Sequence, residues 1–249
     1  MSKYKIIAYL ADWADWSVQD IDAKKLTHIN YAFATIEEGK VVPKVLNQKL
    51  GKIHLLKEIK AKNPHLKTLI SIGGWGADGF SDAALTDESR TLFADTAVEF
   101  MKEYGFDGVD IDWEYPCSSA AGIVSRPEDK QNFTLLLKKT REKLDEEGKR
   151  DNKHYLLTIA AGAGQYFIDG TEMDLVQHYL DFINLMTYDF ATGVDKVTGH
   201  HTNLYESRIC PGHSSEKAVN LFMAQGIPAS KLILGVAFYG RAWSGVDSK

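Results

Sequence analysis

The stretch Phe106-Asp-Gly-Val-Asp-Ile-Asp-Trp-Glu-Tyr115 places four acidic residues within an otherwise apolar run. Successive side chains of a β-strand point to opposite faces, so Asp110, Asp112 and Glu114 share one face and the apolar residues between them share the other. Neighbouring carboxyl groups in this row lie roughly 6–7 Å apart along the strand. Like charges raise one another's pKa and burial raises it further, so the row favours a functional site over a solvated edge strand.

Two chemical interpretations of this acidic row stay open on the residues alone. One is a Mg²⁺ or Ca²⁺ site, completed by an oxygen ligand such as Asp189. The other is acid catalysis, because Glu114 stands at the carboxyl end of its strand, where parallel α/β folds place their active sites. Beside Asp112 and Asp110, which could share a proton, its carboxyl would stay protonated as a general acid requires. Asp107 has the opposite parity, and we expect it to serve local structure.

Seven short β-rich runs alternate with longer helical patterns along the chain, without hairpin signals between them. Several runs are apolar on both faces, which is typical of buried parallel strands. The alternation predicts βαβ units around a parallel sheet, either a barrel or a doubly wound sheet. A dinucleotide-binding sheet is disfavoured because no G-x-G-x-x-G follows the first run. The runs are Lys5–Trp13, Thr27–Ala34, Leu66–Gly73, Phe106–Glu114, Tyr155–Ala161, Phe182–Tyr188 and Leu232–Phe238.

The helical patterns carry their own start and stop signals. Ser125-Arg-Pro-Glu128 matches a capping box and predicts a helix that ends at Gly148. No linker, low-complexity tract or internal repeat interrupts the chain. We therefore expect a single catalytic domain over residues 1–249.

Composition excludes two functional classes. The chain has 249 residues, 44% of them hydrophobic, and a net charge of −5 with both signs scattered along it. It lacks the basic footprint of a nucleic-acid binder, and no apolar run approaches the ~18 residues of a membrane span. The cysteines Cys117 and Cys210 could form one bridge or stay as two free thiols, which we favour. The oligomeric state is not set by these features.

The quoted stretch matches D-x-x-D-x-D-x-E and resembles the signature of glycoside hydrolase family 18, the chitinases and their relatives. Other segments resemble strand motifs of that family in order and spacing, across essentially the whole chain. The resemblance implies a TIM (β/α)8 barrel that hydrolyses the β-1,4 bonds of chitin or N-acetylglucosamine oligosaccharides, without a metal or other cofactor. The matching segments are INYAFA (Ile29–Ala34), SIGGW (Ser71–Trp75), NLMTYD (Asn184–Asp189) and FYGRAW (Phe238–Trp243).

The resemblance also implies roles for individual residues. Glu114 would protonate the glycosidic oxygen, while the 2-acetamido oxygen of the sugar acts as the nucleophile in a substrate-assisted, retaining reaction. Asp112 would orient the acetamido N–H and offset the developing positive charge, and Asp110 would steer Asp112. Tyr188 would donate a hydrogen bond to the acetamido oxygen. Water would then open the oxazolinium ion with Glu114 as the base.

Further residues are candidates for holding the sugar. Gly73 and Gly74 allow a sugar or another backbone to approach closely, and Trp75 could stack on a sugar face. Ser71 could hydrogen-bond an inner aspartate. Core packing is the alternative for the aromatic residues, and a surface ion pair is the alternative for the charged ones. The other candidates for substrate binding are Tyr9, Trp13, Tyr31, Phe33, Tyr115, Met186, Asp189 and Arg241.

Several alternatives accompany the main prediction. An endo-β-N-acetylglucosaminidase or a peptidoglycan-directed hydrolase would share the catalytic residues. A lectin-like, chitin-binding relative would typically lack the acid, and Glu114 is present here. The Cys210-Pro-Gly-His213 piece is a fragment of zinc-ligand spacing, although a loop explains it better. We expect secretion with an export signal that is not part of this sequence, and a cytoplasmic protein is the alternative.

The end of the chain carries one more expectation. Eleven residues follow Phe238, too few for the dozen or more that a parallel crossover needs. A sheet of seven strands would leave its first and seventh strands with unpaired edges. We therefore expect these residues to be the N-terminal part of a longer barrel that lacks its eighth strand, with low activity until that part is restored.

Overall fold

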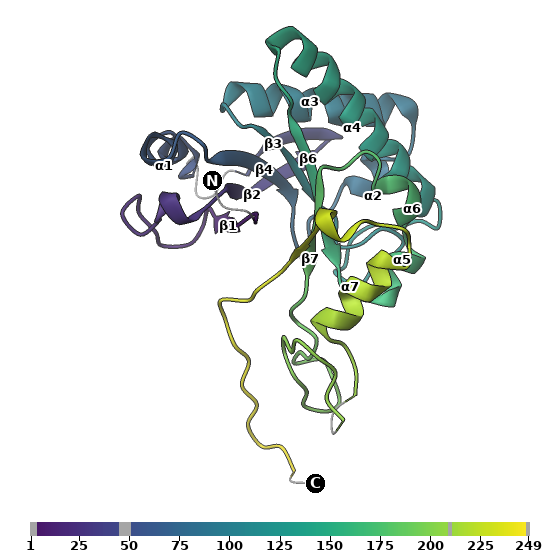
Figure 1. The fold of residues 1–249 in the computed structure, drawn as a ribbon. Coiled ribbons are helices and arrows are strands. Elements are labelled where there is room, and N and C mark those ends of the chain that lie inside the picture. Colours follow the sequence, from purple (N-terminus) through teal and green to yellow (C-terminus); the bar gives the residue numbers. More distant parts are fainter. Residues whose placement is uncertain (1–3, 45–50, 209–210, 248–249) are drawn as a thin grey trace.

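The computed structural model describes residues 4–44, 51–208 and 211–247. Within them, seven parallel strands form one curled sheet in the order β1-β2-β4-β5-β6-β7-β8 (Figure 1). Once the short strand β3 is set aside, every neighbouring pair in the sheet is consecutive along the chain. Their bounds are β1 Ile7–Ala11, β2 His28–Glu37, β4 Lys67–Gly73, β5 Gly108–Asp112, β6 Leu156–Gly162, β7 Phe182–Met186 and β8 Leu232–Leu234.

The described part of the sheet stays open. In it, β1 pairs with β2 alone and β8 pairs with β7 alone, so the seven parallel strands make a half-barrel rather than a closed ring. This confirms the prediction of an incomplete TIM barrel with seven strands. The parallel registers bring the carboxyl ends of all seven strands to one rim, which is where the acidic row of β5 ends.

Helices connect the strands and cover the outside of the sheet. The long helices α3 and α4 pack against each other behind β5 and β6 (Figure 1). None of the helices in the described residues is long and apolar enough to cross a bilayer. The helix bounds are α1 Leu56–Lys62, α2 Phe80–Ala83, α3 Asp87–Glu103, α4 Asp129–Asp151, α5 Gln165–Asp169, α6 Met173–Val176 and α7 Ser215–Met223, with 3₁₀ turns at Ala23–Lys25, Ile53–Leu55 and Ala229–Lys231.

A β-hairpin extends β2 and was missed by the sequence analysis. Strand β3 (Lys40–Pro43) runs antiparallel to β2, and Glu37 lies opposite Lys40. The two residues between them, Glu38 and Gly39, have φ values of 51° and 76°. Positive φ at both central residues is what a tight two-residue hairpin turn requires. The expectation of an alternation without hairpins is therefore wrong at this point.

Helix α4 differs from its prediction at both ends. Its N-cap residue Glu128 makes no side-chain capping bond, so the predicted capping box does not form. Instead, Asp129 Oδ2 accepts the backbone N–H of Arg126 at 2.7 Å. The helix also runs past Gly148 to Asp151. Gly148 serves another purpose, because a side chain there would overlap the carbonyl oxygen of Lys153, which folds back over the last turn.

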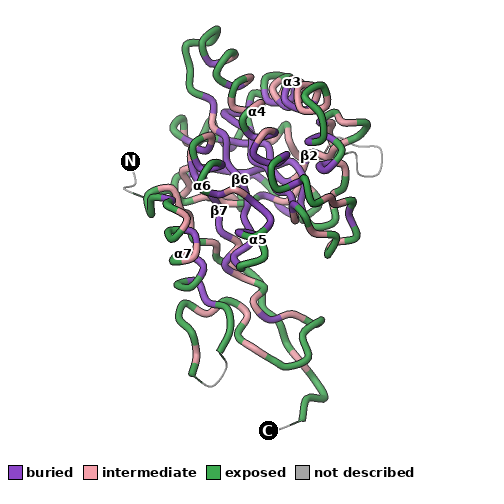
Figure 2. The backbone as a smooth tube through the Cα atoms, turned by 90° about the vertical axis from the view of Figure 1, so that its right-hand side faces the viewer, coloured by how far each residue is buried: buried purple, intermediate pink, exposed green. Residues whose placement is uncertain are grey.

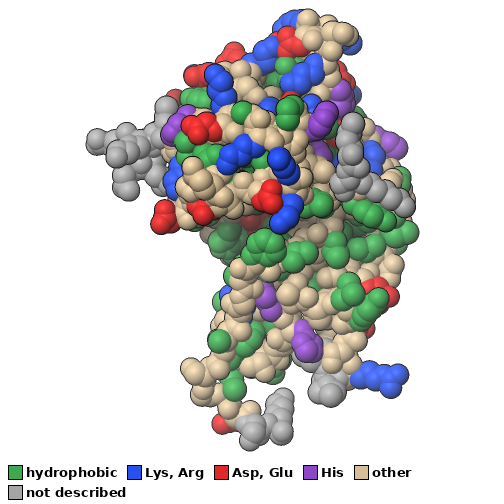
Figure 3. Space-filling model, turned by 60° about the vertical axis from the view of Figure 1, so that its left-hand side comes forward, with side chains coloured by type: hydrophobic (Ala, Val, Ile, Leu, Met, Phe, Trp, Pro, Cys, Tyr) green, Lys and Arg blue, Asp and Glu red, His purple; other side chains and the backbone are tan. Residues whose placement is uncertain are grey.

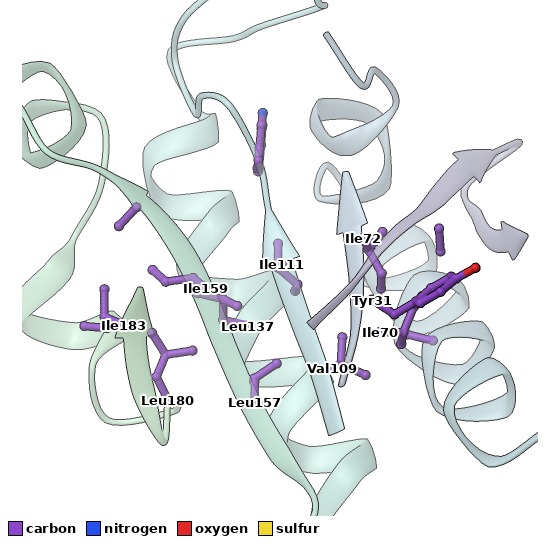
Figure 4. Packing of buried hydrophobic residues seen from close by; sticks show 14 of the residues in the cluster. Tyr31, Ile70, Ile72, Val109, Ile111, Leu137, Leu157, Ile159, Leu180 and Ile183 are labelled. Atoms are coloured by element: carbon purple, nitrogen blue, oxygen red, sulfur yellow. The ribbon is translucent and has the colours of Figure 1, made fainter. Parts of the chain in front are cut away.

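The apolar half of the acidic stretch anchors the core. Trp113 is 1% exposed, and its ring stacks on Phe80 with 5.3 Å between ring centroids. It also meets the ring of Phe133 from α4 edge to face at 5.7 Å. Val109 and Ile111 of the same strand lie in the same buried cluster (Figure 4). Outward packing of these residues turns the acidic residues of the strand toward the barrel interior.

Burial is uneven along the chain. Figure 2 shows that the buried backbone is concentrated in the strands and in the inward sides of α3 and α4. The segments that follow β7 and β8 are mostly exposed and extend away from the sheet (Figures 1 and 2). These two segments begin at the carboxyl rim of the strands, and side chains from both line the cavity there.

Candidate active site

A cavity of about 980 Å³ opens at the carboxyl ends of the strands. A pocket of this size accommodates a drug-sized ligand or several sugar rings. On the face seen in Figure 3, hydrophobic side chains gather in a band across the middle of the molecule. The predicted site residues that line the cavity are Tyr9, Trp13, Phe33, Trp75, Asp112, Glu114, Tyr115, Met186, Tyr188, Asp189 and Arg241.

The carboxyl groups of β5 differ in burial from that of Glu114, which lies two residues beyond the end of the strand. Asp110 is fully buried, Asp112 is 5% exposed, and Glu114 is partly exposed at the cavity wall. Burial raises the pKa of Asp112 well above its usual range, and the nearby charges of Glu114 and Asp110 raise it further. Burial also raises the pKa of Glu114, and the charge of Asp189 adds to that effect. Both cavity-lining acids of the row therefore hold their protons more tightly than free carboxyl groups.

Asp110 lies beneath the cavity floor within a set of hydrogen-bond donors. Its Oδ2 accepts bonds from Tyr9 Oη at 2.8 Å and Ser71 Oγ at 2.7 Å. Its Oδ1 accepts bonds from Thr158 Oγ1 at 2.5 Å and Asn184 Nδ2 at 3.2 Å. Burial raises the pKa of Asp110, and these donors act in the opposite direction. Four donors on one carboxylate hold its orientation and favour its ionised form.

Asp112 has no such set of donors. Its Oδ1 is buried and has no hydrogen-bond partner among the described residues. Its interaction with Asp110 is one of charge, and a hydrogen bond between the two carboxyl groups is not formed in the described part of the chain. The cavity therefore presents a buried acceptor atom that a bound molecule could satisfy, because buried polar atoms are rarely left unpaired.

The paired glycines after β4 serve close packing within the protein. Gly73 and Gly74 have φ values of 117° and 93°, a region that other residues rarely adopt. A side chain at Gly73 would overlap the carbonyl oxygen of Asp112, and one at Gly74 would overlap the ring of Phe33. The N–H of Gly74 also donates to that Asp112 oxygen at 2.9 Å. Protein atoms, and not open space for a sugar, lie against these two glycines. Of the two predicted uses, the close approach of other parts of the protein is therefore the one that the structure shows.

Asp189 gathers three side chains at one side of the cavity. Arg241 Nε donates to its Oδ1 at 2.8 Å, and Tyr239 Oη donates to its Oδ2 at 2.6 Å. His201 Nδ1 lies 3.5 Å from Oδ1. Asp189 and Arg241 therefore form an ion pair, and both also line the cavity. The predicted place in the binding site and the alternative of an ion pair are thus both met by these two residues.

Aromatic side chains form much of the remaining wall. Trp13 and Phe33 stack with 5.8 Å between ring centroids, and Trp75 meets Tyr115 edge to face at 6.3 Å. Trp75 is 64% exposed, which rules out its core-packing alternative. Burial raises the pKa of Tyr188 well above its usual value, so its hydroxyl stays a neutral hydrogen-bond donor.

Two of the residues considered for the site lie elsewhere. Tyr31 is 4% exposed and packs against Phe106 with 6.4 Å between ring centroids, so the expectation that it faces the cavity is wrong. Asp107 lies at the opposite end of β5 from the cavity. Its carboxylate accepts the backbone N–H of Thr68 at 3.0 Å and pairs with Lys60 Nζ at 2.6 Å. Asp107 is thus part of the local structure between neighbouring strands.

Comparison with known proteins now identifies the family. Residues 5–249 match the sequence profile of Glycosyl hydrolases family 18. This chain belongs to glycosyl hydrolase family 18. Chitinase A1 of Niallia circulans is 40% identical over 97% of this chain and 43% of its own length, and chitotriosidase-1 of Mus musculus is 36% identical over 98% and 54%. The chain spans about half the length of the curated relatives it matches.

A solved structure from the same family supports the fold closely. It is a glycoside hydrolase family 18 N-acetylglucosaminidase from Paenibacillus barengoltzii, and it is 48% identical to this chain with a TM-score of 0.87. The match covers 95% of this chain and 69% of that one. The family 18 signature at β5 therefore lies in the incomplete TIM barrel that the sequence predicted.

Several cavity-lining residues of this family 18 chain were missed from the sequence. Tyr166 lies at the start of α5, shortly after β6. Phe190 and Thr192–Asp195 follow β7, and Tyr239 follows β8. All lie in loops or at a helix start, where no periodic pattern marks an inward side chain. Their position directly after a strand was the one available signal, because loops at the carboxyl ends of barrel strands build the active site.

Neither the Mg²⁺ or Ca²⁺ interpretation nor the zinc interpretation is supported by a group of ligands among the described residues. Among residues 4–44, 51–208 and 211–247, no three His, Cys, Asp or Glu side chains come together as a metal site would require. The zinc alternative depended on Cys210, which lies outside the described residues. Cys117 is exposed with a free thiol.

Proposed function

We propose that this chain carries the catalytic machinery of a chitin-degrading glycosidase that cleaves β-1,4 bonds between N-acetylglucosamine units with retention of configuration. The observation that carries this proposal is that Glu114, Asp112 and Tyr188 line one cavity at the carboxyl ends of the strands. Membership of family 18 supports the same substrate class. A secreted location, which suits an enzyme acting on an insoluble polymer, is part of the proposal.

Glu114 is the general acid in the proposed reaction. A general acid must hold a proton near the working pH, and burial together with the charge of Asp189 raises the pKa of Glu114 in that direction. Its carboxyl lies at the cavity wall, where it can reach a glycosidic oxygen. Proton transfer to that oxygen breaks the bond to the leaving sugar and leaves Glu114 as a carboxylate.

The acetamido group of the substrate supplies the nucleophile. Its carbonyl oxygen attacks the anomeric carbon, and Tyr188 donates a hydrogen bond to that oxygen. The buried Asp112 Oδ1, which has no partner among the described residues, accepts the acetamido N–H. These contacts orient the group and offset the positive charge of the oxazolinium ion. Water then opens the ring, and the Glu114 carboxylate takes the proton of that water.

The test compares oligomers that do and do not carry the acetyl group. Fully acetylated N-acetylglucosamine oligomers should be hydrolysed with retention of configuration, and a thiazoline analogue of the intermediate should inhibit. Oligomers without the acetyl group on the sugar at the cleaved bond should not react. Efficient cleavage of a fully deacetylated oligomer would contradict substrate assistance. Binding of acetylated oligomers without any hydrolysis would favour the lectin-like alternative.

An N-acetylglucosaminidase is the second candidate, because the relative from Paenibacillus barengoltzii has that activity in its name. The same oligomer experiment separates the candidates by product size. Release of single N-acetylglucosamine units supports the glucosaminidase, and release of longer fragments supports a chitinase. Turnover of peptidoglycan fragments in place of chitin oligomers would support the third family alternative, since all three share the residues named above.

A further inference from the structure

Thr158 is a polar residue in the middle of a buried apolar strand. It belongs to β6, whose run Leu156-Leu-Thr-Ile-Ala-Ala-Gly162 is otherwise apolar, and its side chain is fully buried. Valine has nearly the same shape and also favours strands, so packing does not require the hydroxyl. A buried hydroxyl costs free energy unless it is hydrogen-bonded, which indicates that the Thr158 hydroxyl serves a particular partner.

The partner of Thr158 is Asp110. The strand registers place Ser71 of β4, Asp110 of β5 and Thr158 of β6 side by side at one level of the sheet. The two hydroxyls hold different oxygens of the carboxyl group, because Ser71 Oγ donates to Oδ2 at 2.7 Å and Thr158 Oγ1 donates to Oδ1 at 2.5 Å. The sequence analysis considered Ser71 for such a contact and missed Thr158. One hydroxyl on each side thus holds the Asp110 carboxyl group.

Two further donors complete the surroundings of this carboxyl group. Tyr9 Oη donates to Asp110 Oδ2 at 2.8 Å, and Asn184 Nδ2 donates to Asp110 Oδ1 at 3.2 Å. Asn184 Nδ2 also donates to Tyr9 Oη at 3.2 Å, and an amide nitrogen carries two hydrogens for these two bonds. Each oxygen of Asp110 therefore accepts two hydrogen bonds. A carboxylate has about four acceptor positions in all, so Asp110 has none left for a further donor.

The full set of donors on Asp110 bears on Asp112, the next acid of the row. Burial raises the pKa of Asp112 well above its usual range, so Asp112 carries a proton that it could donate to Asp110. Such a bond would need a free acceptor position on Asp110, and the bonds that the described residues form leave none. The buried Oδ1 of Asp112 has no partner among those residues either.

We propose that Thr158 is a positioning residue, whose hydroxyl occupies an acceptor position on Asp110 that Asp112 would otherwise take. Asp112 is thereby left free for the acetamido group of the substrate. This inference rests on the proposed function, in which Asp112 accepts the acetamido N–H. Thr158 is not among the residues that line the cavity, so it acts through the two aspartates.

The consequence for catalysis concerns what sets the orientation of Asp112. An Asp112 carboxyl that donates to Asp110 is oriented by a group beneath the cavity floor. An Asp112 carboxyl without that bond is oriented by the substrate that enters the cavity. Because interactions made in the transition state determine turnover, a carboxyl group already bound to Asp110 would lose part of its effect on the acetamido group.

The experiment compares crystal structures of the 249-residue chain and its variants. Thr158→Val keeps the shape and removes the donor, so Asp112 should rotate and bring one of its oxygens within about 3 Å of Asp110 Oδ1. Thr158→Ser keeps a hydroxyl, and the two carboxyl groups should stay apart as in the parent. Thr140→Val is the matched control, because Thr140 is also fully buried and its hydroxyl donates to the Leu136 carbonyl oxygen within α4 at 2.8 Å. This control should leave both carboxyl groups in place.

Rotation of Asp112 is the result that a merely structural role of Thr158 would not produce. Unchanged carboxyl groups in Thr158→Val would overturn the proposal, because the hydroxyl would then only stabilise the barrel. A hydrogen bond between Asp110 and Asp112 in the parent would overturn it as well, since Asp110 would not be saturated. Should Thr158→Val fail to fold, the parent and Thr158→Ser still decide, because such a bond in either of them contradicts the proposal and its absence from both supports it.

Turnover provides the second measurement. In active protein, kcat on acetylated oligomers should fall roughly tenfold in Thr158→Val, which corresponds to one hydrogen bond, and should stay close to that of the parent in Thr158→Ser and Thr140→Val. The thiazoline analogue should bind Thr158→Val more weakly by a similar factor.

The crystal comparison needs no turnover, so it separates the two proposals. Rotation of Asp112 in a chain that hydrolyses no acetylated oligomer would support the control of Asp112 by Thr158 and contradict the proposed function. Hydrolysis of acetylated oligomers without rotation of Asp112 in Thr158→Val would contradict the role of Thr158 and leave the proposed function standing.

Discussion

Asp107 and Glu114 belong to the same ten-residue stretch, yet their surroundings oppose each other. Asp107 precedes β5, and its carboxylate pairs with Lys60 at 2.6 Å and Lys153 at 3.1 Å. Burial opposes its ionisation, but the bonds from Lys60 and from the backbone of Thr68 outweigh burial and lower the pKa to about 2. Glu114 follows β5, where burial and the charge of Asp189 raise its pKa.

The difference shows that the two ends of one strand can serve separate purposes, stability at one end and chemistry at the other. At the amino end of β5, a buried acid is compensated by cations and a backbone donor, which is what a stabilising ion pair requires. At the carboxyl end, Asp112 and Glu114 form no ion pair with any residue that the structure describes. Uncompensated buried acids cost stability and hold their protons, as the proposed catalysis requires. Substitutions at the two ends of β5 should therefore affect stability and turnover differently.

The largest expected effect is on turnover, at the carboxyl end. Glu114→Gln keeps the shape of the side chain and removes its proton, so kcat should fall by between about 10² and 10⁴. Affinity for acetylated oligomers should survive, because the amide still fills the same space. Asp107→Asn is the matched substitution at the other end and should leave kcat of the folded protein nearly unchanged. Near-normal turnover of Glu114→Gln would remove the acid from this position.

Asp112→Asn should change activity and stability in opposite directions. Loss of the carboxylate that orients the acetamido group should reduce kcat by roughly 10²-fold. Because the pKa of Asp112 is raised in the folded state, the parent loses stability as the pH rises through that value. The variant carries no such group, so its free energy of unfolding relative to the parent should be greater at pH 8 than at pH 4. Denaturant titrations at the two pH values measure this, and an equal difference at both would contradict it.

The sequence predicted the arrangement at the carboxyl end of β5 better than the surroundings of Asp107. Strand alternation alone was enough to place Asp110, Asp112 and Glu114 on one face and Asp107 off it. The lysines that compensate Asp107 could not be predicted, because Lys60 comes from α1 and Lys153 from the loop after α4. Such partners meet through tertiary packing, and no local pattern announces them.

The fold was predicted to a similar depth. The seven parallel strands follow from buried apolar runs, but the hairpin of β3 depended on Glu38 and Gly39, which match no strong turn signal. The cavity was predicted where side chains stand on strands, as at Tyr9 and Phe33. It was missed where loops supply the wall, as at Tyr166, because a loop residue's direction is set by its packing and not by a period.

His28, at the amino end of β2, provides a further test with a group that is positively charged when it is protonated. It is 8% exposed, and burial followed by the charges of Lys5 and Lys67 lowers its pKa to about 4. An unfolded histidine takes up its proton near pH 6.5, so the unfolded state binds more protons between about pH 6.5 and 4. Stability should fall by roughly 2 kcal/mol across that window and much less in His28→Gln. Thermal melts at pH 7 and pH 4.5 compare the two.

Asp107 should give the smallest effect, and one that falls in a separate pH window. Its folded pKa of about 2 lies below its unfolded value, so its contribution is present above about pH 4 and is lost as the pH falls toward 2. Asp107→Asn should lower the free energy of unfolding at pH 7 by roughly 1–2 kcal/mol, because the partner lysines are partly exposed and screened.

Asp22→Asn is a suitable control for this last prediction, since Asp22 forms an exposed pair with Lys25 at 3.2 Å. An exposed pair of that kind should contribute less than about 0.5 kcal/mol. Urea titrations of the parent and both variants at pH 7 and pH 3 give the comparison, and the deficit of Asp107→Asn should shrink at pH 3. A deficit of equal size at both pH values would mean that Asp107 stabilises the barrel through its shape, and the contrast with Glu114 would then not be one of charge.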